Sequence, residues 1–206
     1  MDKIKVAIVE DDPVWLSSLT TFLNRQGDLE VISTASNKDD AVEMAKNNDM
    51  DVILMDINLT ENKFDGIYAA SEIYQEKKVK IIMLTSLTAE EIIKKSFMAG
   101  AVNYVSKDNY TEIPSAIRSV YNRNSPFEVL LQDYWRLKES EQTESLTPAE
   151  KELLDFIEKG YTQTQISNML YKTPGTLKCQ VNKILKKMGV KSTKEAIKKI
   201  KNKGLI

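Results

Sequence analysis

The sequence predicts an α/β doubly wound parallel sheet of five strands, followed by a small all-α domain. Up to residue 124, short apolar runs alternate with amphipathic segments of helical period, and from Leu146 onward the pattern is helical throughout. The length of 206 residues exceeds a typical domain of roughly 100–150 residues, which favours two domains.

The first domain is predicted from five apolar runs that are short enough to be strands. They lie at residues 4–9, 31–34, 52–55, 81–84 and 102–105. Helical periods lie between and after them, near 13–25, 38–47, 66–77, 89–99 and 111–122. This alternation is typical of a parallel sheet covered on both faces. Ligands of such sheets bind beyond the carboxyl ends of the strands.

The second domain is predicted to be entirely helical. Helices are expected over 148–159, 162–170, 174–188 and 193–203. Residues 125–145 separate the two domains, with a short helix over 127–138 and the polar stretch KESEQTES after it, which is expected to be a linker. The predicted organisation is therefore a first domain over 1–124, a linker over 125–145 and a second domain over 146–206.

Several classes of protein are excluded by what the sequence lacks. It contains no histidine, which excludes histidine-based catalytic triads and HExxH zinc sites, and it contains no GxxxxGK[ST] phosphate loop. Any phosphoryl group must therefore come from another molecule. No apolar run approaches the roughly 18 residues of a membrane helix, and the single cysteine fits a reducing compartment. We expect a cytoplasmic protein without a membrane partner.

The net charge of −1 hides a difference between the two parts of the chain. From Leu146 onward there are 13 basic and 5 acidic residues, a net charge of +8. The preceding residues hold the other 16 basic and 25 acidic side chains, a net charge of −9. A basic second domain suggests contact with a polyanion, although a lysine-rich surface can also be simply solvated.

Chemically active side chains follow four of the predicted strands. Because parallel strands end at one edge of a sheet, these side chains are expected to converge. They are Glu10, Asp11 and Asp12 after the first strand, Asp56 after the third, Thr85 after the fourth and Lys107 after the fifth. Acidic residues are also common in solvated loops, but convergence from four strands favours a site.

The charges of this set suggest phosphoryl chemistry with a divalent cation. Carboxylates 4 Å apart repel by roughly 4 kcal/mol at an effective dielectric near 20. Mg²⁺, which binds carboxylates, water and phosphate, offsets that repulsion. Asp56 could then act as a nucleophile toward a phosphoryl group, while Lys107 and Thr85 stabilise the phosphoryl oxygens.

Residues 3–124 resemble the receiver domain of two-component response regulators, which has a flavodoxin-like fold. The resemblance rests on the motifs IVEDDP, LMDINL, LTS and GAVNYVSKD, in the order and spacing of that family. It implies a phosphoacceptor, a magnesium site, a phosphoryl-stabilising pair and a switch pair. The phosphoacceptor is Asp56, and the magnesium ligands are Glu10, Asp11, Asp56 and the backbone carbonyl of Asn58. The phosphoryl-stabilising pair is Thr85 and Lys107, and the switch pair is Thr85 and Tyr104. Thr60 stands where the family usually has proline, and the loop before Asp65 is longer than usual.

The second domain has the signals of a helix-turn-helix. Thr147-Pro148 and Thr173-Pro174 can each begin a helix, and Gly160 can end one. One face of the helix over 174–188 is apolar. The opposite face, with its flank, carries polar side chains that can reach DNA. They are Lys178, Cys179, Asn182, Lys183 and Lys186.

Residues 146–206 resemble the LuxR-type helix-turn-helix. The segments LTPAEKELLDFIEKGYTQTQI, TLKCQVNKILKKMGV and KKIKNKGLI carry this resemblance, and the preceding receiver points to the NarL/FixJ type of response regulator. The resemblance places Lys178, Cys179 and Asn182 at base-facing positions. Gln180 replaces the usual histidine and Leu177 the usual valine, which bears on the DNA sequence that is recognised.

The function expected from these resemblances is regulation of transcription under the control of Asp56 phosphorylation. The implied partners are a sensor histidine kinase, promoter DNA and a second copy of the chain as a homodimer. The chain is not expected to be an enzyme with its own substrate turnover. Two alternatives remain open, namely a regulator whose helical domain binds another protein and a phosphatase or hydrolase. Cys179 could be a redox-sensitive thiol or simply a small side chain against DNA.

Overall fold

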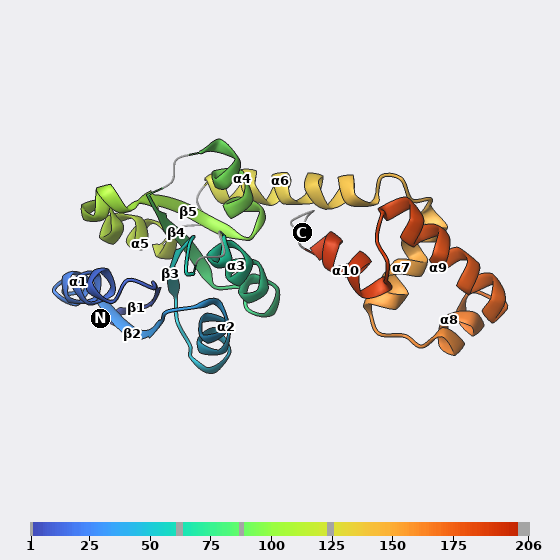
Figure 1. The fold of residues 1–206 in the computed structure, drawn as a ribbon, viewed down its shortest axis with the longest axis horizontal. Helices are drawn as coiled ribbons and strands as arrows, with labels where there is room; N and C mark the ends of the chain where they lie inside the picture. The colour runs from blue at the N-terminus through green and yellow to red at the C-terminus, as the bar shows by residue number, and fades with distance from the viewer. Residues whose placement is uncertain (1, 61–63, 87–88, 123–125, 202–206) are drawn as a thin grey trace. The chain divides into compact units, whose positions relative to one another are not determined.

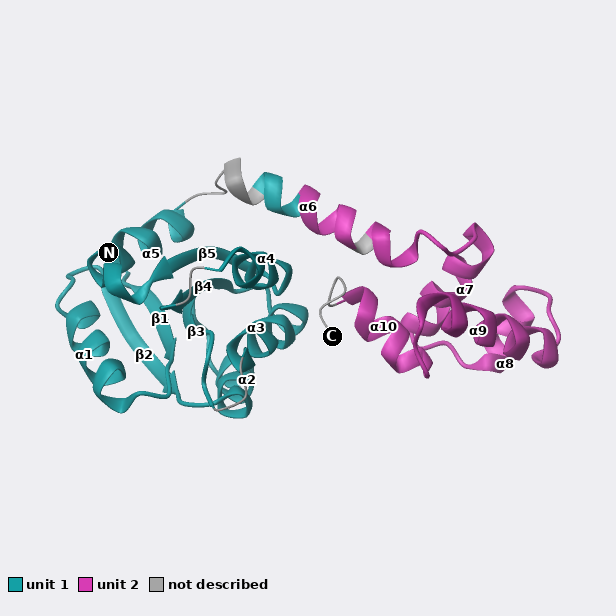
Figure 2. Ribbon diagram, turned by 45° about the horizontal axis from the view of Figure 1, so that its top comes forward, with its two compact units in different colours: residues 1–132 teal, residues 133–206 magenta. Residues whose placement is uncertain are grey.

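The computed structural model describes residues 2–60, 64–86, 89–122 and 126–201. It divides into two compact units, residues 1–132 and residues 133–206, which Figure 2 colours separately. No helix among the described residues is long and apolar enough to cross a membrane.

The first unit is built on a five-stranded parallel sheet with the order β2-β1-β3-β4-β5. The predicted doubly wound α/β class is confirmed. The strands are β1 (Ile4–Val9), β2 (Leu29–Ala35), β3 (Val52–Asp56), β4 (Lys80–Thr85) and β5 (Ala101–Ser106). Four of the five are one to three residues longer than the apolar runs that predicted them, because strand pairing continues into flanking polar positions such as Lys80.

Helices cover both faces of this sheet (Figures 1 and 2). They are α1 (Pro13–Asn24), α2 (Lys38–Asn47), α3 (Asp65–Glu76), α4 (Glu90–Met98) and α5 (Ile113–Asn122). A 3₁₀ segment, η1 (Lys107–Glu112), connects β5 to α5 and occupies the start of the helix predicted over 111–122. One core combines side chains of α1 and α5 with alternate residues of the central strands, among them Ile8 and Leu54, both fully buried.

The strand register determines which side chains meet at the carboxyl edge. Val9 pairs with Met55, Asp56 with Leu84 and Thr85 with Ser106. Glu10, the residue after β1, therefore lies beside the end of β3. The chain continues from Ser106 directly into Lys107. The candidate site is thus assembled by β1, β3, β4 and β5 together.

The segment predicted as a linker with a short helix forms one helix of 18 residues, α6 (Pro126–Thr143). Leu131 and Trp135 are buried on it, with 6% and 8% of their surface exposed. The helix includes residues 138–143 of the polar stretch that was expected to be a linker, and Lys138 forms an ion pair with Glu141 one turn later. The division between the two units falls within α6, at Gln132 and Asp133.

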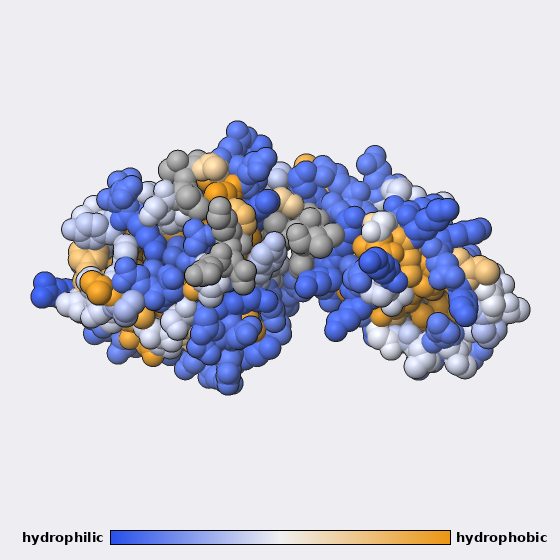
Figure 3. All heavy atoms as spheres, viewed as in Figure 1, coloured by the Kyte–Doolittle hydropathy of each residue, from blue (hydrophilic) through white to orange (hydrophobic). Residues whose placement is uncertain are grey.

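The described residues of the second unit form four further helices, as predicted. They are α7 (Pro148–Glu158), α8 (Gln163–Met169), α9 (Pro174–Met188) and α10 (Thr193–Lys201). Residues 202–203, which were predicted to continue the last helix, lie outside the described residues. One buried hydrophobic cluster joins the four helices, and its members include Leu153, Ile166, Leu177, Ile184 and Ala196. In Figure 3, hydrophilic side chains surround a hydrophobic area on the visible face of this unit.

Candidate functional site

Three carboxylates meet at the carboxyl edge of the sheet. One oxygen from each of Glu10, Asp11 and Asp56 lies within 4.8 Å of the others. Glu10 and Asp56 have only 1% and 6% of their surface exposed, whereas Asp11 is exposed. The predicted cluster of acidic residues is therefore present, with two members buried and the third open to solvent.

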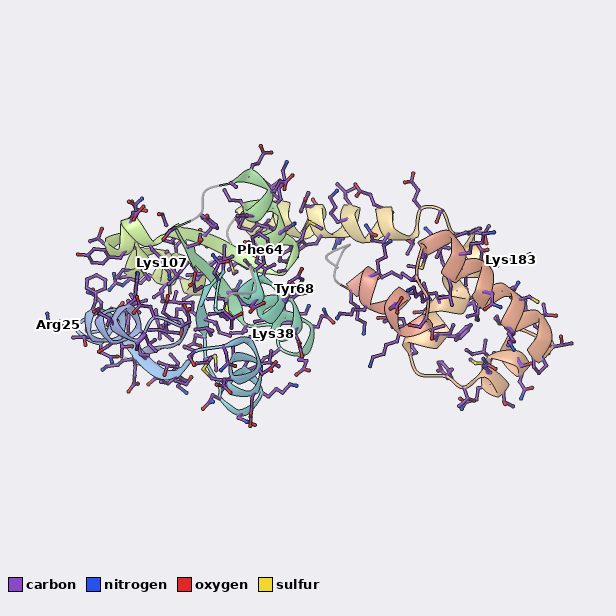
Figure 4. The ribbon with its side chains drawn as sticks, in the orientation of Figure 1. Arg25, Lys38, Phe64, Tyr68, Lys107 and Lys183 are labelled. Atoms are coloured by element: carbon purple, nitrogen blue, oxygen red, sulfur yellow. The ribbon has the colours of Figure 1, made fainter. Side chains whose placement is uncertain are left out.

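Lys107 connects the two buried carboxylates. Its Nζ lies 2.7 Å from Glu10 Oε2 and 3.0 Å from Asp56 Oδ2. The side chain leaves the end of β5 (Figure 4) and is itself only 14% exposed, with its ammonium 5.6 Å from the centre of the Trp15 ring. Lys107 thus supplies a positive charge where the carboxylates repel each other most strongly.

Burial and this ion pair act on the protonation of the site. Burial raises the pKa of both Glu10 and Asp56 above their ordinary values, and Lys107 counteracts the increase. Burial alone would lower the pKa of Lys107, but its hydrogen bonds and ion pairs with Glu10 and Asp56 raise it. The lysine therefore carries its positive charge at neutral pH.

The backbone around Asp56 orients its carboxylate. The Ile57 N–H donates to Asp56 Oδ1 at 2.7 Å. Gly66, near the start of α3, packs against this segment, and its N–H donates to the Ile57 carbonyl at 3.0 Å. A Cβ at Gly66 would lie 1.7 Å from the carbonyl oxygen of Asp56. Only glycine fits here, so α3 closely supports the chain at Asp56.

The donor set fits the magnesium ion that the sequence predicted. Glu10, Asp11 and Asp56 offer only oxygen ligands, and they combine one exposed with two buried carboxylates. Mg²⁺ prefers oxygen ligands and keeps several water molecules, which an open side of the cluster permits. The Asn58 side chain accepts a hydrogen bond from the Phe64 N–H at 3.3 Å, and metal binding by the Asn58 carbonyl stays a prediction.

The predicted switch residues lie next to each other. Thr85 ends β4 and is 1% exposed. Tyr104 lies on the neighbouring strand, half-buried, with its hydroxyl oxygen enclosed. Burial raises the pKa of Tyr104, and the nearby Thr85 side chain acts in the opposite direction. A change at Thr85 can therefore reach Tyr104 directly.

Asp12 has a structural role that was not predicted from the sequence. Its Oδ1 accepts from the N–H groups of Val14 and Trp15 at 2.8 and 3.1 Å and caps α1. The signal was present, because aspartate followed by proline is a common helix start. Capping directs this carboxylate to the helix rather than to the acidic cluster.

The loop after β3 is closed by polar contacts on its described residues. The Thr60 hydroxyl donates to the Asp65 carboxylate. Phe64 adopts a left-handed conformation with φ of 78°, which is uncommon for a residue with a side chain. Its ring lies 5.2 Å from the ammonium of Lys95 on α4. The additional loop length inferred from the sequence falls largely on residues 61–63, outside the described residues.

The second candidate surface lies on α9. Thr173 caps this helix and Gly189, with φ of 66°, ends it. Leu177, Ile184 and Met188 face the core. The polar residues predicted to reach DNA are all exposed, and Figure 4 labels one of them. They are Lys178, Cys179, Asn182, Lys183 and Lys186.

Two polar contacts of the second unit were not predicted from the sequence. Lys172, in the turn between α8 and α9, donates to Gln180 Oε1 at 3.1 Å. Lys187 lies 2.6 Å from Glu150 Oε2. Glu150 also accepts from the Thr147 N–H, and with Lys187 as the main cause its pKa falls to about 2. The capping-box pattern TPAE in the sequence indicates the contact between Glu150 and Thr147. No sequence signal indicates that Lys187 is the partner of Glu150.

Comparison with known proteins finds two families along the chain. A family model described as "Response regulator receiver domain" matches residues 6–118. A second, described as "Bacterial regulatory proteins, luxR family", matches residues 144–200.

Curated relatives match nearly the whole chain. Response regulator protein VraR of Staphylococcus saprophyticus is 32% identical over 199 residues, which cover 94% of either chain. Transcriptional regulatory protein DesR of Bacillus subtilis is 32% identical over 203 residues, which cover 98% of either chain.

Solved structures share the fold. The response regulator domain of Thermotoga maritima CheB matches with a TM-score of 0.55 and 29% identity, covering 60% of this chain and 99% of that one. The RcsB response regulator of Salmonella typhimurium matches over 96% of this chain and 98% of its own, with a TM-score of 0.54 and 20% identity. The second likeness supports the fold alone.

Proposed function

This chain belongs to the response regulators that combine a receiver domain with a LuxR-type DNA-binding domain, and we propose that phosphorylation of Asp56 by a partner histidine kinase controls its binding to promoter DNA. The family membership implies regulation of transcription. The proposed organisation is a receiver over 1–124, a connecting segment over 125–145 and a DNA-binding domain over 146–206, acting in the cytoplasm.

The observation that carries the proposal is the position of Asp56, which lies between the ammonium of Lys107 and the carboxylates of Glu10 and Asp11. Its Oδ2 contacts Lys107 at 3.0 Å, and its Oδ1 is held by the Ile57 N–H at 2.7 Å. An oriented, buried carboxylate can attack phosphorus. Glu10 and Asp11 complete the oxygen ligands for Mg²⁺, which when bound neutralises negative charge on the phosphoryl oxygens.

The proposed step transfers a phosphoryl group from a phosphohistidine of the kinase. An Asp56 oxygen forms a bond to phosphorus as the phosphorus–nitrogen bond breaks, and the released imidazole takes a proton from solvent. Lys107 stabilises the transferred oxygens, and the Thr85 hydroxyl donates to one of them. A groove of about 440 Å³ beside Lys107, whose lining includes Trp15, Phe22 and Tyr110, leaves room for a donor to approach.

The signal then passes from the receiver to the DNA-binding surface. Thr85 shifts toward the phosphoryl group and Tyr104, its neighbour, changes position with it. The altered receiver surface favours a homodimer, which presents two α9 helices to paired half-sites about one DNA turn apart. The proposed DNA-contacting residues are Lys178, Cys179, Asn182, Lys183 and Lys186.

Intact-mass measurement tests the phosphorylation step. The full chain is incubated with a small phosphodonor, with and without Mg²⁺, and we expect one magnesium-dependent phosphoryl adduct. Asp56→Asn should abolish the adduct. Asp49→Asn is the matched control, because its side chain is 92% exposed and lies outside the cluster. An adduct that persists in Asp56→Asn would reject Asp56 as the acceptor.

Salt dependence tests the DNA-binding step. A protein that neutralises phosphates loses affinity steeply as salt rises. We expect Lys183→Gln to reduce the slope of log affinity against log salt concentration by about one. A flat salt response of the unmodified chain would favour the alternative in which the helical domain binds another protein. Equal DNA binding by the unmodified chain under oxidising and reducing conditions would exclude a redox role for Cys179, because its exposed thiol is then present and has no effect.

A further inference from the structure

The turn between α8 and α9 contains a residue in an unfavourable backbone conformation. Tyr171 has φ of +51°. The Lys172 N–H donates to the Ser167 carbonyl at 3.0 Å, and the Tyr171 N–H donates to the Asn168 carbonyl at 3.4 Å. This pair of hydrogen bonds is a common way for a helix to end, and glycine usually occupies the position that Tyr171 has here. A side chain with a Cβ is disfavoured in this region, whereas glycine adopts it readily.

The tyrosine side chain gains little packing in return. Tyr171 has 96% of its surface exposed, more than any other large hydrophobic side chain among the described residues. Its neighbour Met169 is 46% exposed. A residue that is both strained and solvated is maintained at a cost to the fold, which suggests a role in function.

The turn is fixed at both ends, which defines the direction of the Cα–Cβ bond of Tyr171. The Ser167 hydroxyl on α8 donates to the Lys172 carbonyl, and the Lys172 ammonium donates to Gln180 Oε1 on α9 at 3.1 Å. Thr173, the next residue, caps α9 by accepting from the Thr176 N–H at 3.2 Å.

The charge around Tyr171 identifies the kind of partner. Residues 159–194 contain eight lysines and no Asp or Glu. These 36 residues include α8, the turn and α9. A surface of this charge matches a polyanion better than the acidic or neutral surface of a typical protein partner.

We propose that Tyr171 contacts the DNA backbone, with its hydroxyl donating to a phosphate oxygen. This inference rests on the proposed function. A recognition helix enters the major groove with its N-terminal residues, so the turn just before it lies near the phosphates. Tyrosine hydroxyls are among the groups that donate to phosphates in such complexes.

The test measures DNA affinity and stability together in the full chain. The probe is a mixed-sequence duplex about three helical turns long, because a backbone contact is independent of sequence. Melting of the unit Asp133–Ile206 is followed by Trp135 fluorescence in a Trp15→Phe background, which leaves Trp135 as the single tryptophan.

We expect Tyr171→Gly to weaken DNA binding by about three- to tenfold while raising the melting temperature by roughly 2–6 °C. Tyr171→Phe keeps the ring and the strain, and should weaken binding without a gain in stability. Because Tyr171 is uncharged, neither variant should change the salt slope, whereas Lys178→Gln should reduce it by about one. Met169→Ala, the exposed control in the same region, should bind normally.

The outcomes separate this inference from the function on which it rests. If Lys178→Gln weakens binding but Tyr171→Gly or Tyr171→Phe does not, the Tyr171 contact is rejected and DNA binding stands. The contact is also rejected if Met169→Ala weakens binding as much as Tyr171→Gly. If the chain incubated with the phosphodonor and Mg²⁺ does not bind the duplex and Lys178→Gln changes nothing, both proposals fail.

Discussion

Replacing Lys107 with methionine tests how the acidic site is stabilised. The ammonium lies 2.7 Å from Glu10 and 3.0 Å from Asp56, and at an effective dielectric near 20 each attraction is worth about 5–6 kcal/mol. The two carboxylates, with oxygens within 4.8 Å, repel by at least about 3.5 kcal/mol. Water entry and protonation relieve part of the imbalance, so we expect Lys107→Met to lower the free energy of unfolding by about 3–5 kcal/mol.

This loss should depend on pH in a defined direction. Burial raises the pKa of Glu10 and Asp56 in the folded state. A raised carboxyl pKa contributes stability that is fully present below the unfolded-state pKa and is lost as the pH rises through the folded-state pKa. Without Lys107 both carboxyl pKa values rise further, so the deficit should be largest at neutral pH and shrink as the pH falls.

Urea unfolding of the metal-free protein provides the measurement. Trp15 reports on the first unit in a Trp135→Phe background, and the difference between Lys107→Met and unmodified protein is recorded at neutral and mildly acidic pH, with and without Mg²⁺. Both acid and Mg²⁺ should restore stability to the variant. Lys94→Met, which removes an exposed partner of Glu90, should have no measurable effect. A deficit that is unchanged by acid and by Mg²⁺ would show that lost packing, rather than charge, is responsible.

Three further substitutions test other parts of the fold. Gly66→Ala places a Cβ 1.7 Å from the Asp56 carbonyl, so it should destabilise the first unit by several kcal/mol, about 3 or more, and abolish the phosphoryl adduct; normal unfolding and phosphorylation would contradict this. Glu150→Gln removes the charge attraction between this side chain and Lys187. The Glu150 pKa is lowered from 4.5 to about 2, so its contribution to the free energy of unfolding is present above pH 4.5 and is lost as the pH falls through about 2. Unfolding measured as a function of pH should therefore show the variant to be less stable than the unmodified chain above pH 4.5 and equally stable at the acid end. Leu54→Ala, at a fully buried position of β3, should cost about 2–5 kcal/mol in urea unfolding, and a smaller loss would indicate that the core relaxes into the space.

The strand-end residues could be predicted because their placement depends on topology alone. Apolar runs of strand length identify β1, β3, β4 and β5, and parallel pairing then brings Glu10, Asp56, Thr85 and Lys107 to one edge. The direct contact of Lys107 with both buried carboxylates could not be predicted, because it depends on side-chain rotamers and on how deeply each group is buried.

Two local features escaped prediction for different physical reasons. The polar stretch at the end of α6 was interpreted as a linker from its composition, yet lysine, glutamate and glutamine are good helix formers, and the Lys138–Glu141 pair supports the helix. Tyr171 carries no sequence signal for a left-handed conformation, because glycine and asparagine are the residues that normally mark it.

If Asp56 is phosphorylated as proposed, the charges at the acidic site bear on how long the phosphorylated state lasts. Glu10, Asp11, Asp56 and Lys107 together carry −3 + 1 = −2, which one divalent cation balances. Converting the Asp56 carboxylate into an acyl phosphate adds up to about one further negative charge. The proposed phosphorylated state, with the metal bound, would then carry uncompensated charge in a partly buried place. In the proposed function, hydrolysis of the acyl phosphate would remove that excess charge, so the electrostatics of the site would favour return to the unphosphorylated state.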